Sequence, residues 1–359
     1  MVELWMPMGW TRPEGMAAQA RRAEADGWDG LMVSDTQCLQ ADPFVMMTLA
    51  AAATERLGLS ISTSNPVTRH PAVAASAIAS VAAIAGDRVL YGVGRGDSAL
   101  AYVGGAPASV RTFEEYVAAV ARYLRREPVP FDSIARWRLT DDVTVLELGD
   151  APSHSGIRWL TADDPVVRVQ VFATGPRVIG VGGRHADRMS FGIGADVARV
   201  RWAIDLARTA RKDAGRDPDT LSLGTIVPIG VADDLERARR SIANMVASEG
   251  RFSVMSGKVV GPMTDHQREV YEAIAANYDM NNHGGAGTQV EVLTQEFIDS
   301  FAIVGPPSRC IERIVELVEL GLDHLMLATP QGDAALEDQQ LGYRRVVEEV
   351  LPGVRDALR

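Results

Sequence analysis

The chain has 359 residues, of which 47% are hydrophobic and 23% charged. These shares are close to the averages of soluble globular proteins, so they exclude a largely disordered chain and supply a substantial core. Lysine plus arginine total 36 against 47 aspartate plus glutamate, a net charge of −11 at pH 7. Such an acidic balance disfavours a phosphate-backbone partner, and we expect no binding of nucleic acid.

The cysteines and the N-terminus exclude further classes. Cys38 and Cys310 are far apart and have no CxxC spacing, so we expect reduced thiols, and no His/Asp/Glu cluster has the spacing of a metal site. The opening MVELWMPMGWTRPEG lacks the features of a secretory signal, and the apolar stretch from His70 to Gly86 is shorter than the roughly 20 residues of a membrane span. We therefore expect a cytoplasmic protein without metal or membrane contact.

Short strand-like runs alternate with helical patterns in the first third of the chain. Strands are predicted at Glu3–Met8, Gly30–Ser34, Leu57–Thr63 and Val89–Val93. Helices are predicted at Glu14–Asp26, Pro43–Arg56, His70–Gly86 and Thr112–Arg126. This rhythm predicts parallel strand pairing through right-handed crossovers.

The rhythm breaks after Pro128. Trp137 to Leu148 has the polar-apolar alternation of β structure, and Gly149 to Asp164 is rich in Gly, Pro, Ser and Asp. We expect residues 128–165 to form an excursion over the mouth of a barrel, not a separate domain.

The alternation then resumes. Strands are predicted at Val167–Ala173, Arg188–Ile193, Leu221–Val231, Phe301–Val304 and His324–Ala328, with helices at Pro176–His185, Ala195–Ala214 and Pro307–Leu320 and after Ala334. The region from Asp233 to Ser300 is predicted to be helical, with a mobile loop at Asn281–Gln289, and residues 250–300 form a second insertion. The count predicts eight βα units, hence a single α/β domain over residues 1–359 with a (β/α)8 TIM barrel fold. A doubly wound sheet would need fewer units or a domain break.

Barrel chemistry lies on the loops that follow the strands. Four such stretches carry polar or glycine-rich sequence: Ser34–Asp35, Ser62–Pro71, Gly92–Ser98 and Ala173–Arg177. The order NPVTRHPAVAASAIAS and then GVGRGDSALAYVG resembles the methylenetetrahydromethanopterin reductase branch of the bacterial luciferase-like superfamily. The resemblance is strongest over Ile61–Gly105, continues through Ala173–Ala195 and is weaker over Phe301–Ile314.

This resemblance implies a (β/α)8 barrel, usually dimeric, that binds FMN or the deazaflavin F420 with its ring across the barrel mouth. It also implies a non-prolyl cis peptide bond that supports the ring. The matching bond here is Ser62–Thr63, with a serine where the family usually has glycine.

The coenzyme tail is expected along the two following loops. We predict contacts from Gly94, Arg95 and Gly96, and from Thr174, Gly175, Pro176 and Arg177. The helix that begins at Pro176 favours an anion at its N-terminus, although Thr174 as a simple helix cap would produce the same pattern. Because Arg95 and Arg177 suit a longer anionic tail, they favour F420 over FMN.

Three further residues each have two interpretations. Asp35 is either a helix cap or an inward catalytic and coenzyme-binding group, and Asn65 either caps the bulge or bonds the carbonyl edge of the coenzyme. His70 precedes a helix, so capping competes with catalysis. His154 and His283 lie in expected mouth loops and are candidates for substrate contact.

The first functional hypothesis is F420-dependent hydride transfer to or from a small organic substrate. The alternatives are an FMN-dependent monooxygenase and a flavin-binding protein without turnover, which the fold alone does not separate. A homodimer is expected, because the segments Pro43–Arg56 and His70–Gly86 are alanine-rich on more faces than one barrel wall buries.

Overall fold

The computed structural model describes residues 2–8, 12–255, 257–283, 285 and 287–359. Its nine strands are β1 (Glu3–Pro7), β2 (Gly30–Val33), β3 (Gly58–Ile61), β4 (Val89–Val93), β5 (Arg168–Ala173), β6 (Arg188–Phe191), β7 (Ser222–Val231), β8 (Ile303–Gly305) and β9 (His324–Ala328). Most of these strand residues are buried on both faces, as expected for a parallel sheet covered by helices.

Eight of the strands close a parallel barrel. The ring runs from β1 through β7 in sequence order, and β9 closes it by pairing with both β7 and β1. β8 pairs alongside the last three residues of β7, Ile229–Val231, and in the described part of the chain has no second partner strand. The predicted (β/α)8 barrel is therefore confirmed, with β8 as an extra short strand beside the ring.

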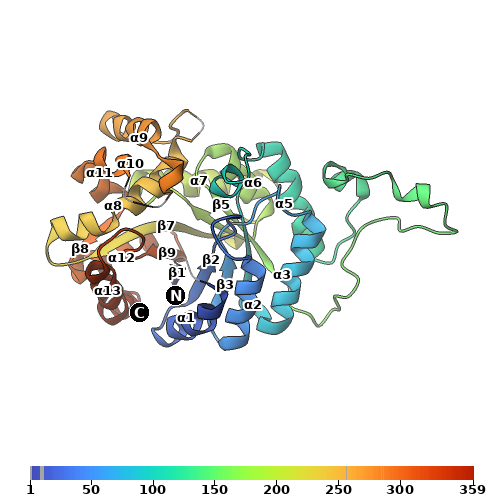
Figure 1. Ribbon diagram of the computed structural model, residues 1–359, viewed down its shortest axis with the longest axis horizontal. Helices are drawn as coiled ribbons and strands as arrows, with labels where there is room; N and C mark the ends of the chain where they lie inside the picture. The colour runs from blue at the N-terminus through green and yellow to red at the C-terminus, as the bar shows by residue number, and fades with distance from the viewer. Residues whose placement is uncertain (1, 9–11, 256, 284, 286) are drawn as a thin grey trace.

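The helices surround the barrel, and some of them lie beyond one of its ends (Figure 1). They are α1 (Pro13–Ala25), α2 (Pro43–Ala53), α3 (Pro71–Ala85), α4 (Ser98–Ala101), α5 (Val110–Leu124), α6 (Pro176–His185), α7 (Val197–Asp213), α8 (Leu235–Gly250), α9 (Asp265–Asn277), α10 (Thr288–Glu291), α11 (Gln295–Phe301), α12 (Pro307–Glu319), α13 (Leu336–Arg345) and α14 (Leu351–Ala357). None of the helices within the described ranges is long and apolar enough to cross a membrane.

Large side chains fill the barrel interior because glycines face them. Trp5 pairs with Gly30, and Gly30 pairs with Gly58. A Cβ atom on Gly30 would lie 2.2 Å from the Trp5 ring, and one on Gly58 would lie 2.7 Å from it. Contacts this short do not occur between real atoms, so the glycines at the starts of β2 and β3 make room for the indole.

A chain of polar side chains also crosses the interior. Ser60 contacts Gln170 at 3.0 Å, Gln170 donates to Ser190 at 2.7 Å, and Ser190 contacts His324 Nε2 at 2.9 Å. The second imidazole nitrogen, Nδ1, lies 2.7 Å from Asp323 Oδ1. Each member has a partner, as buried polar groups require.

The excursion at 128–165 differs from the expectation in two ways. The β structure predicted for Trp137–Leu148 is wrong: 3₁₀ turns lie at Phe131–Trp137 and Val143–Leu146 instead. Alternation makes a strand only where a partner strand and a second layer exist, and Leu146 and Leu148 are exposed.

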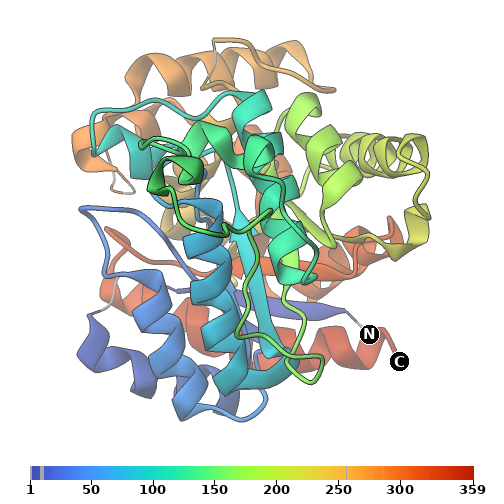
Figure 2. The ribbon, with the colours of Figure 1, turned by 90° about the vertical axis from the view of Figure 1, so that its right-hand side faces the viewer.

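The position of the excursion also differs. Trp137 reaches the loop after β3, donating from Nε1 to Pro66 O at 2.7 Å. Beyond it the green segment extends away from the barrel instead of covering the mouth (Figure 1), and Figure 2 shows it in front of α3 and α5. His154, on this segment, is exposed and lies 3.1 Å from the Ser153 hydroxyl.

The helix α8 and the start of the second insertion do cover the mouth. Asn244, in α8, donates to Gln331 O, beyond β9, at 3.1 Å. Arg251, just after α8, is 2.6 Å from Asp97, beyond β4. Since β4 and β9 lie on opposite sides of the eight-strand ring, the C-terminal half of α8 crosses the barrel mouth. Of the predicted loop at 281–289, Gly284 and Ala286 lie outside the described residues.

Candidate active site

The bulge after β3 is the centre of the candidate site. The Ser62–Thr63 peptide bond is cis, as the family resemblance implied. Ser62 N donates to Val33 O, on β2, at 2.7 Å, and Ser64 N donates to Gly92 O, on β4, at 2.9 Å. The bulge is thus held by the strands on both of its sides.

Asp35 lies behind this bulge. Its side chain is 1% exposed and accepts hydrogen bonds from the Ser64 hydroxyl at 2.7 Å and from Gln37. Burial raises the pKa of Asp35, while the bond from Ser64 and the charge of Arg69, 3.9 Å away, oppose that rise. Asp35 therefore faces inward, as predicted, and is tied to the bulge through Ser64.

Asn65 and His70 both act as local caps. The fully buried Asn65 accepts at Oδ1 from the backbone N–H groups of Val67 and Thr68, each at 3.0 Å. Its Nδ2 has no hydrogen-bond partner among the described residues, so a donor remains for a ligand. His70 caps α3 by accepting at Nδ1 from Ala72 N at 3.1 Å, and burial lowers its pKa. A catalytic role for His70 stays a prediction.

The glycines after β4 bring two predicted loops into contact. A Cβ atom on Gly94 would lie 2.9 Å from Thr63 Oγ1, and one on Gly96 would lie 2.9 Å from the Asn65 Cβ. Gly96 also has φ +76°, a conformation that favours glycine. Both positions need glycine for the β3 and β4 loops to meet this closely.

Two arginines from neighbouring loops lie near each other. Arg95 donates from Nε to Ala108 O at 2.5 Å, and its pKa is lowered by burial and by the charge of Arg177. β4 and β5 pair in parallel, so the loops that carry Arg95 and Arg177 lie side by side at the same end of the barrel. Two cations on neighbouring loops are a suitable environment for an anion.

The start of α6 lies beside this pair. Gly175 is the N-cap residue and has no side-chain cap, and Pro176 takes the first helical position. Thr174 is not the cap, since its hydroxyl donates to Gly192 O at 3.3 Å. Among the described residues, a Cβ atom on Gly175 would meet Val260 alone within 4 Å, at 3.9 Å, so these residues leave the position open.

Asp35, Asn65, Gly94 and Thr174 follow β2, β3, β4 and β5 in turn. Because these strands are all parallel, the four residues lie at one end of the barrel, which confirms the predicted placement. In the described residues no group of three or more His, Cys, Asp or Glu side chains could hold a metal ion.

A charged and aromatic group covers this end, and sequence reasoning missed most of it. We call it the roof: Asp97, Tyr102, Glu249, Arg251, Tyr278 and His283. Burial raises the pKa of Glu249 to about 7 against the opposing charge of Arg251, and burial and Arg251 lower the pKa of His283 to about 4. Tyr278 OH lies 3.0 Å from His283 Nδ1. The one sequence signal for Glu249 is an acidic residue in the last helical turn, where the helix dipole disfavours it.

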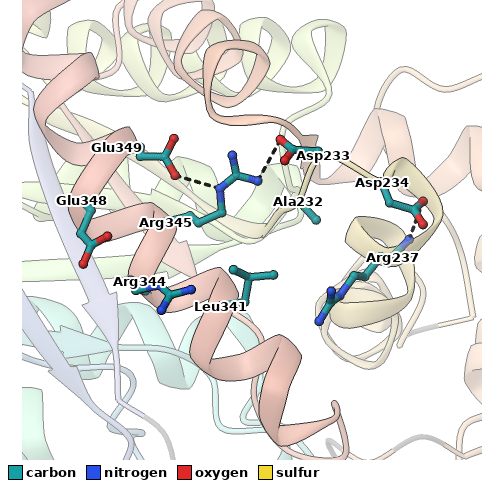
Figure 3. A pocket seen from close by; sticks show the side chains of 9 residues that line it. All are labelled: Ala232, Asp233, Asp234, Arg237, Leu341, Arg344, Arg345, Glu348 and Glu349. Carbon is teal, nitrogen blue, oxygen red and sulfur yellow. Dashed lines mark hydrogen bonds and ion pairs between the residues drawn. The ribbon is translucent and has the colours of Figure 1, made fainter.

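A cavity of about 540 Å³ lies elsewhere, between the start of α8 and α13 with the helical turn that follows it (Figure 3). Its wall is charged, and two of its arginines are paired: Arg345 lies 2.9 Å from Asp233 and 2.8 Å from Glu349, and Arg237 contacts Asp338. None of the predicted site residues lines this cavity. Its ion pairs join α8 to the C-terminal helices.

The closed parallel barrel, with a cis peptide bulge and glycine-rich loops at one end, defines a class of barrel oxidoreductases. The chain belongs to the luciferase-like monooxygenase family, whose model matches residues 6–324. It is therefore an oxidoreductase of the luciferase-like superfamily.

Relatives of two kinds are similar to this chain. It is 24% identical over 334 residues to a 5,10-methylenetetrahydromethanopterin reductase of Methanopyrus kandleri, covering 87% of this chain and 86% of the relative. It is 26% identical over 358 residues to an F420-dependent glucose-6-phosphate dehydrogenase of Beutenbergia cavernae, covering 96% and 94%.

Solved structures share the fold. An F420-dependent secondary alcohol dehydrogenase superposes with a TM-score of 0.72 at 19% identity, covering 99% of each chain. An EDTA monooxygenase from Chelativorans superposes with a TM-score of 0.67 at 14% identity, covering 99% of this chain and 94% of the other.

Proposed function

We propose that the protein is an F420-dependent oxidoreductase that transfers a hydride between the deazaflavin and a small organic substrate. The observation that carries this proposal is that Arg95 and Arg177 come from the loops after the neighbouring strands β4 and β5, beside the open position at Gly175, where an anionic tail fits. The similarity to an F420-dependent glucose-6-phosphate dehydrogenase and to an F420-dependent secondary alcohol dehydrogenase supports the same choice.

The described residues fit such a coenzyme. The Ser62–Thr63 bulge would support the ring, and the Asn65 Nδ2, unpartnered among the described residues, would donate to an acceptor on it. Gly94 and Gly96 keep side chains out of the path of the tail, and Arg95 and Arg177 would hold its phosphate. The bound coenzyme supplies the hydride, while Asp35 holds the bulge in place through Ser64.

Titration of the purified protein with F420 and with FMN, followed by fluorescence, tests this proposal. Arg95→Ala removes a charge-assisted contact of about 1.5–3 kcal/mol, so F420 affinity should fall about 10- to 100-fold. Gly175→Leu should also weaken binding, because the added side chain occupies the path of the tail. Arg136→Ala is the matched control, since Arg136 lies on the excursion paired with Glu115, and should leave affinity unchanged.

The outcome distinguishes the alternatives. If Arg95→Ala and Gly175→Leu bind both coenzymes as tightly as the parent, the coenzyme tail does not bind at Arg95 and Gly175, and the proposed site is wrong. If the parent prefers FMN to F420, the FMN-dependent monooxygenase becomes the first hypothesis. The family name and the EDTA monooxygenase structure support that second candidate.

A homodimer is part of the proposal. The helices α2 and α3 contain no charged residue, and their outer face exposes Val45, Val73 and Ile84 to 51%, 55% and 54%. A charge-free apolar face of this kind is typical of an interface. Light scattering should give about twice the chain mass of 38.6 kDa, and Val73→Asp should halve it. Val166→Asp, at a residue 52% exposed but outside α2 and α3, should leave the mass unchanged.

A further inference from the structure

Two polar atoms at the end of α8 have no partner in the described residues. They are Oε2 of Glu249 and Nε of Arg251, and both are shut off from solvent. Arg251 is only 5% exposed, and its remaining nitrogens contact Asp97 at 2.6 Å and Ser248. An unpartnered buried acceptor and donor two residues apart cost free energy, so a ligand that bonds both explains their presence.

Their position points to the substrate. α8 crosses the barrel mouth, and Asp97, the partner of Arg251, belongs to the same loop as Gly94, Arg95 and Gly96. The segment after α8 continues over the mouth, since a Cβ atom on Gly192, after β6, would lie 3.9 Å from the Phe252 ring. Glu249 and Arg251 thus lie above the loops that we assign to the coenzyme.

Of the titratable groups in the roof, Glu249 is the one whose pKa lies near neutrality. The charges that act on it are Arg251 and Asp97, and burial keeps it partly protonated with a pKa of about 7. His283 stays neutral at pH 7, because burial and Arg251 lower its pKa to about 4. Burial raises the pKa of the Tyr102 hydroxyl, and the pairing with Arg251 opposes the rise that burial causes at Asp97.

We propose, resting on the proposed function, that Glu249 is the acid–base residue of the substrate site and that Arg251 Nε binds the substrate heteroatom. In the reducing direction, hydride from the reduced deazaflavin adds to the carbon of a C=O or C=N group. The π electrons move to the heteroatom, which takes the proton of the Glu249 carboxyl. The carboxylate left behind takes up a proton from water that enters when the product leaves, and the oxidising direction is the reverse.

The test compares the parent with Glu249→Gln and with Glu272→Gln, an exposed carboxyl on α9. Carboxyl-labelled glutamate followed by carbon NMR should give one resonance that titrates near pH 7, absent only from Glu249→Gln. With reduced F420 and a panel of aldehydes, ketones and imines, Glu249→Gln should lower kcat about 100-fold with little change in KM. Glu272→Gln should match the parent.

F420 titration separates the two proposals. Glu249→Gln should bind F420 within about twofold of the parent, because Glu249 contacts substrate and not coenzyme. If the parent binds no F420, the proposed function fails, and the NMR titration still decides on Glu249. A titration near the ordinary glutamate value of 4.5, or Glu249→Gln turning over at the parent rate, overturns the inference.

Discussion

Two histidines in this molecule, His324 fully buried and His283 half-buried, have the same altered pKa and different surroundings. His324, inside the barrel, and His283, in the roof, both have a pKa lowered to about 4, first of all by burial. Both ring nitrogens of His324 have partners, Ser190 on one side and Asp323 on the other. His283 has Tyr278 at Nδ1 and lies in the roof with the unpartnered Glu249 and Arg251 atoms.

The comparison shows that a shifted pKa alone does not mark a functional site. Burial of the imidazole lowers its pKa in either place. What differs is the completeness of hydrogen bonding. In the polar network inside the barrel every side chain has a partner, whereas in the roof one acceptor and one donor have none among the described residues. We therefore assign stability to His324 and substrate contact to the roof.

The largest expected effect is the difference in unfolding free energy between the alanine variants of the two histidines. His324→Ala removes packing inside the barrel and leaves Ser190 without one partner, so unfolding free energy should fall by about 3 kcal/mol. His283→Ala should cost about 1 kcal/mol or less. Urea denaturation measures both, with the exposed His154→Ala as the control. Equal losses at the two histidines would contradict the comparison.

A second test uses pH. A histidine whose folded pKa is depressed loses stability as pH falls from about 6.5 to about 4, because the unfolded chain binds the proton more readily. Glu249, with its raised pKa, acts in the opposite direction: its contribution is present below about 4.5 and is lost as pH rises to about 7.

Substitutions at His283 and Glu249 should therefore have opposite effects on how the free energy of unfolding changes between pH 7 and pH 4. His283→Gln should make the loss of stability on acidification shallower, and Glu249→Gln should make it steeper, each by about 1–3 kcal/mol. Urea midpoints between pH 7 and pH 4 measure this. Parallel curves for the parent and both variants would show that neither group titrates as described.

The smallest effect concerns the hydroxyls that hold the two imidazoles. Ser190→Ala leaves Gln170 and His324 each short of a partner in the interior and should cost about 1.5 kcal/mol. Tyr278→Phe removes the bond to His283 and a long contact of 3.5 Å with the Ser248 hydroxyl, and should cost about 0.5 kcal/mol. Thermal unfolding of the two variants ranks them, and a larger loss for Tyr278→Phe would reverse our assignment.

Much of this fold could be predicted because its signals are local. Strand runs such as Val89–Val93 and helices such as α6 begin and end within a few residues of the predicted bounds. The strand predicted within the excursion was wrong because the alternating pattern needs a partner strand, and the described fold provides none there. Local periodicity contains no information on such a partner.

The site divides in the same way. Residues that directly follow a strand, such as Asp35 and Asn65, could be placed at the mouth from sequence alone. Glu249 and Arg251 could not, because their position depends on α8 crossing from β7 to the loop after β4. That path is fixed by contacts between residues more than 150 positions apart.

The packing of Trp5 over Gly30 and Gly58 has a consequence for how such sequences diverge. No side chain enters at position 30 or 58 while an indole occupies position 5, since each added Cβ would overlap the ring. A smaller residue at position 5 alone would leave a void between three strands. We therefore expect substitutions at positions 5, 30 and 58 to occur together in related sequences and not one at a time.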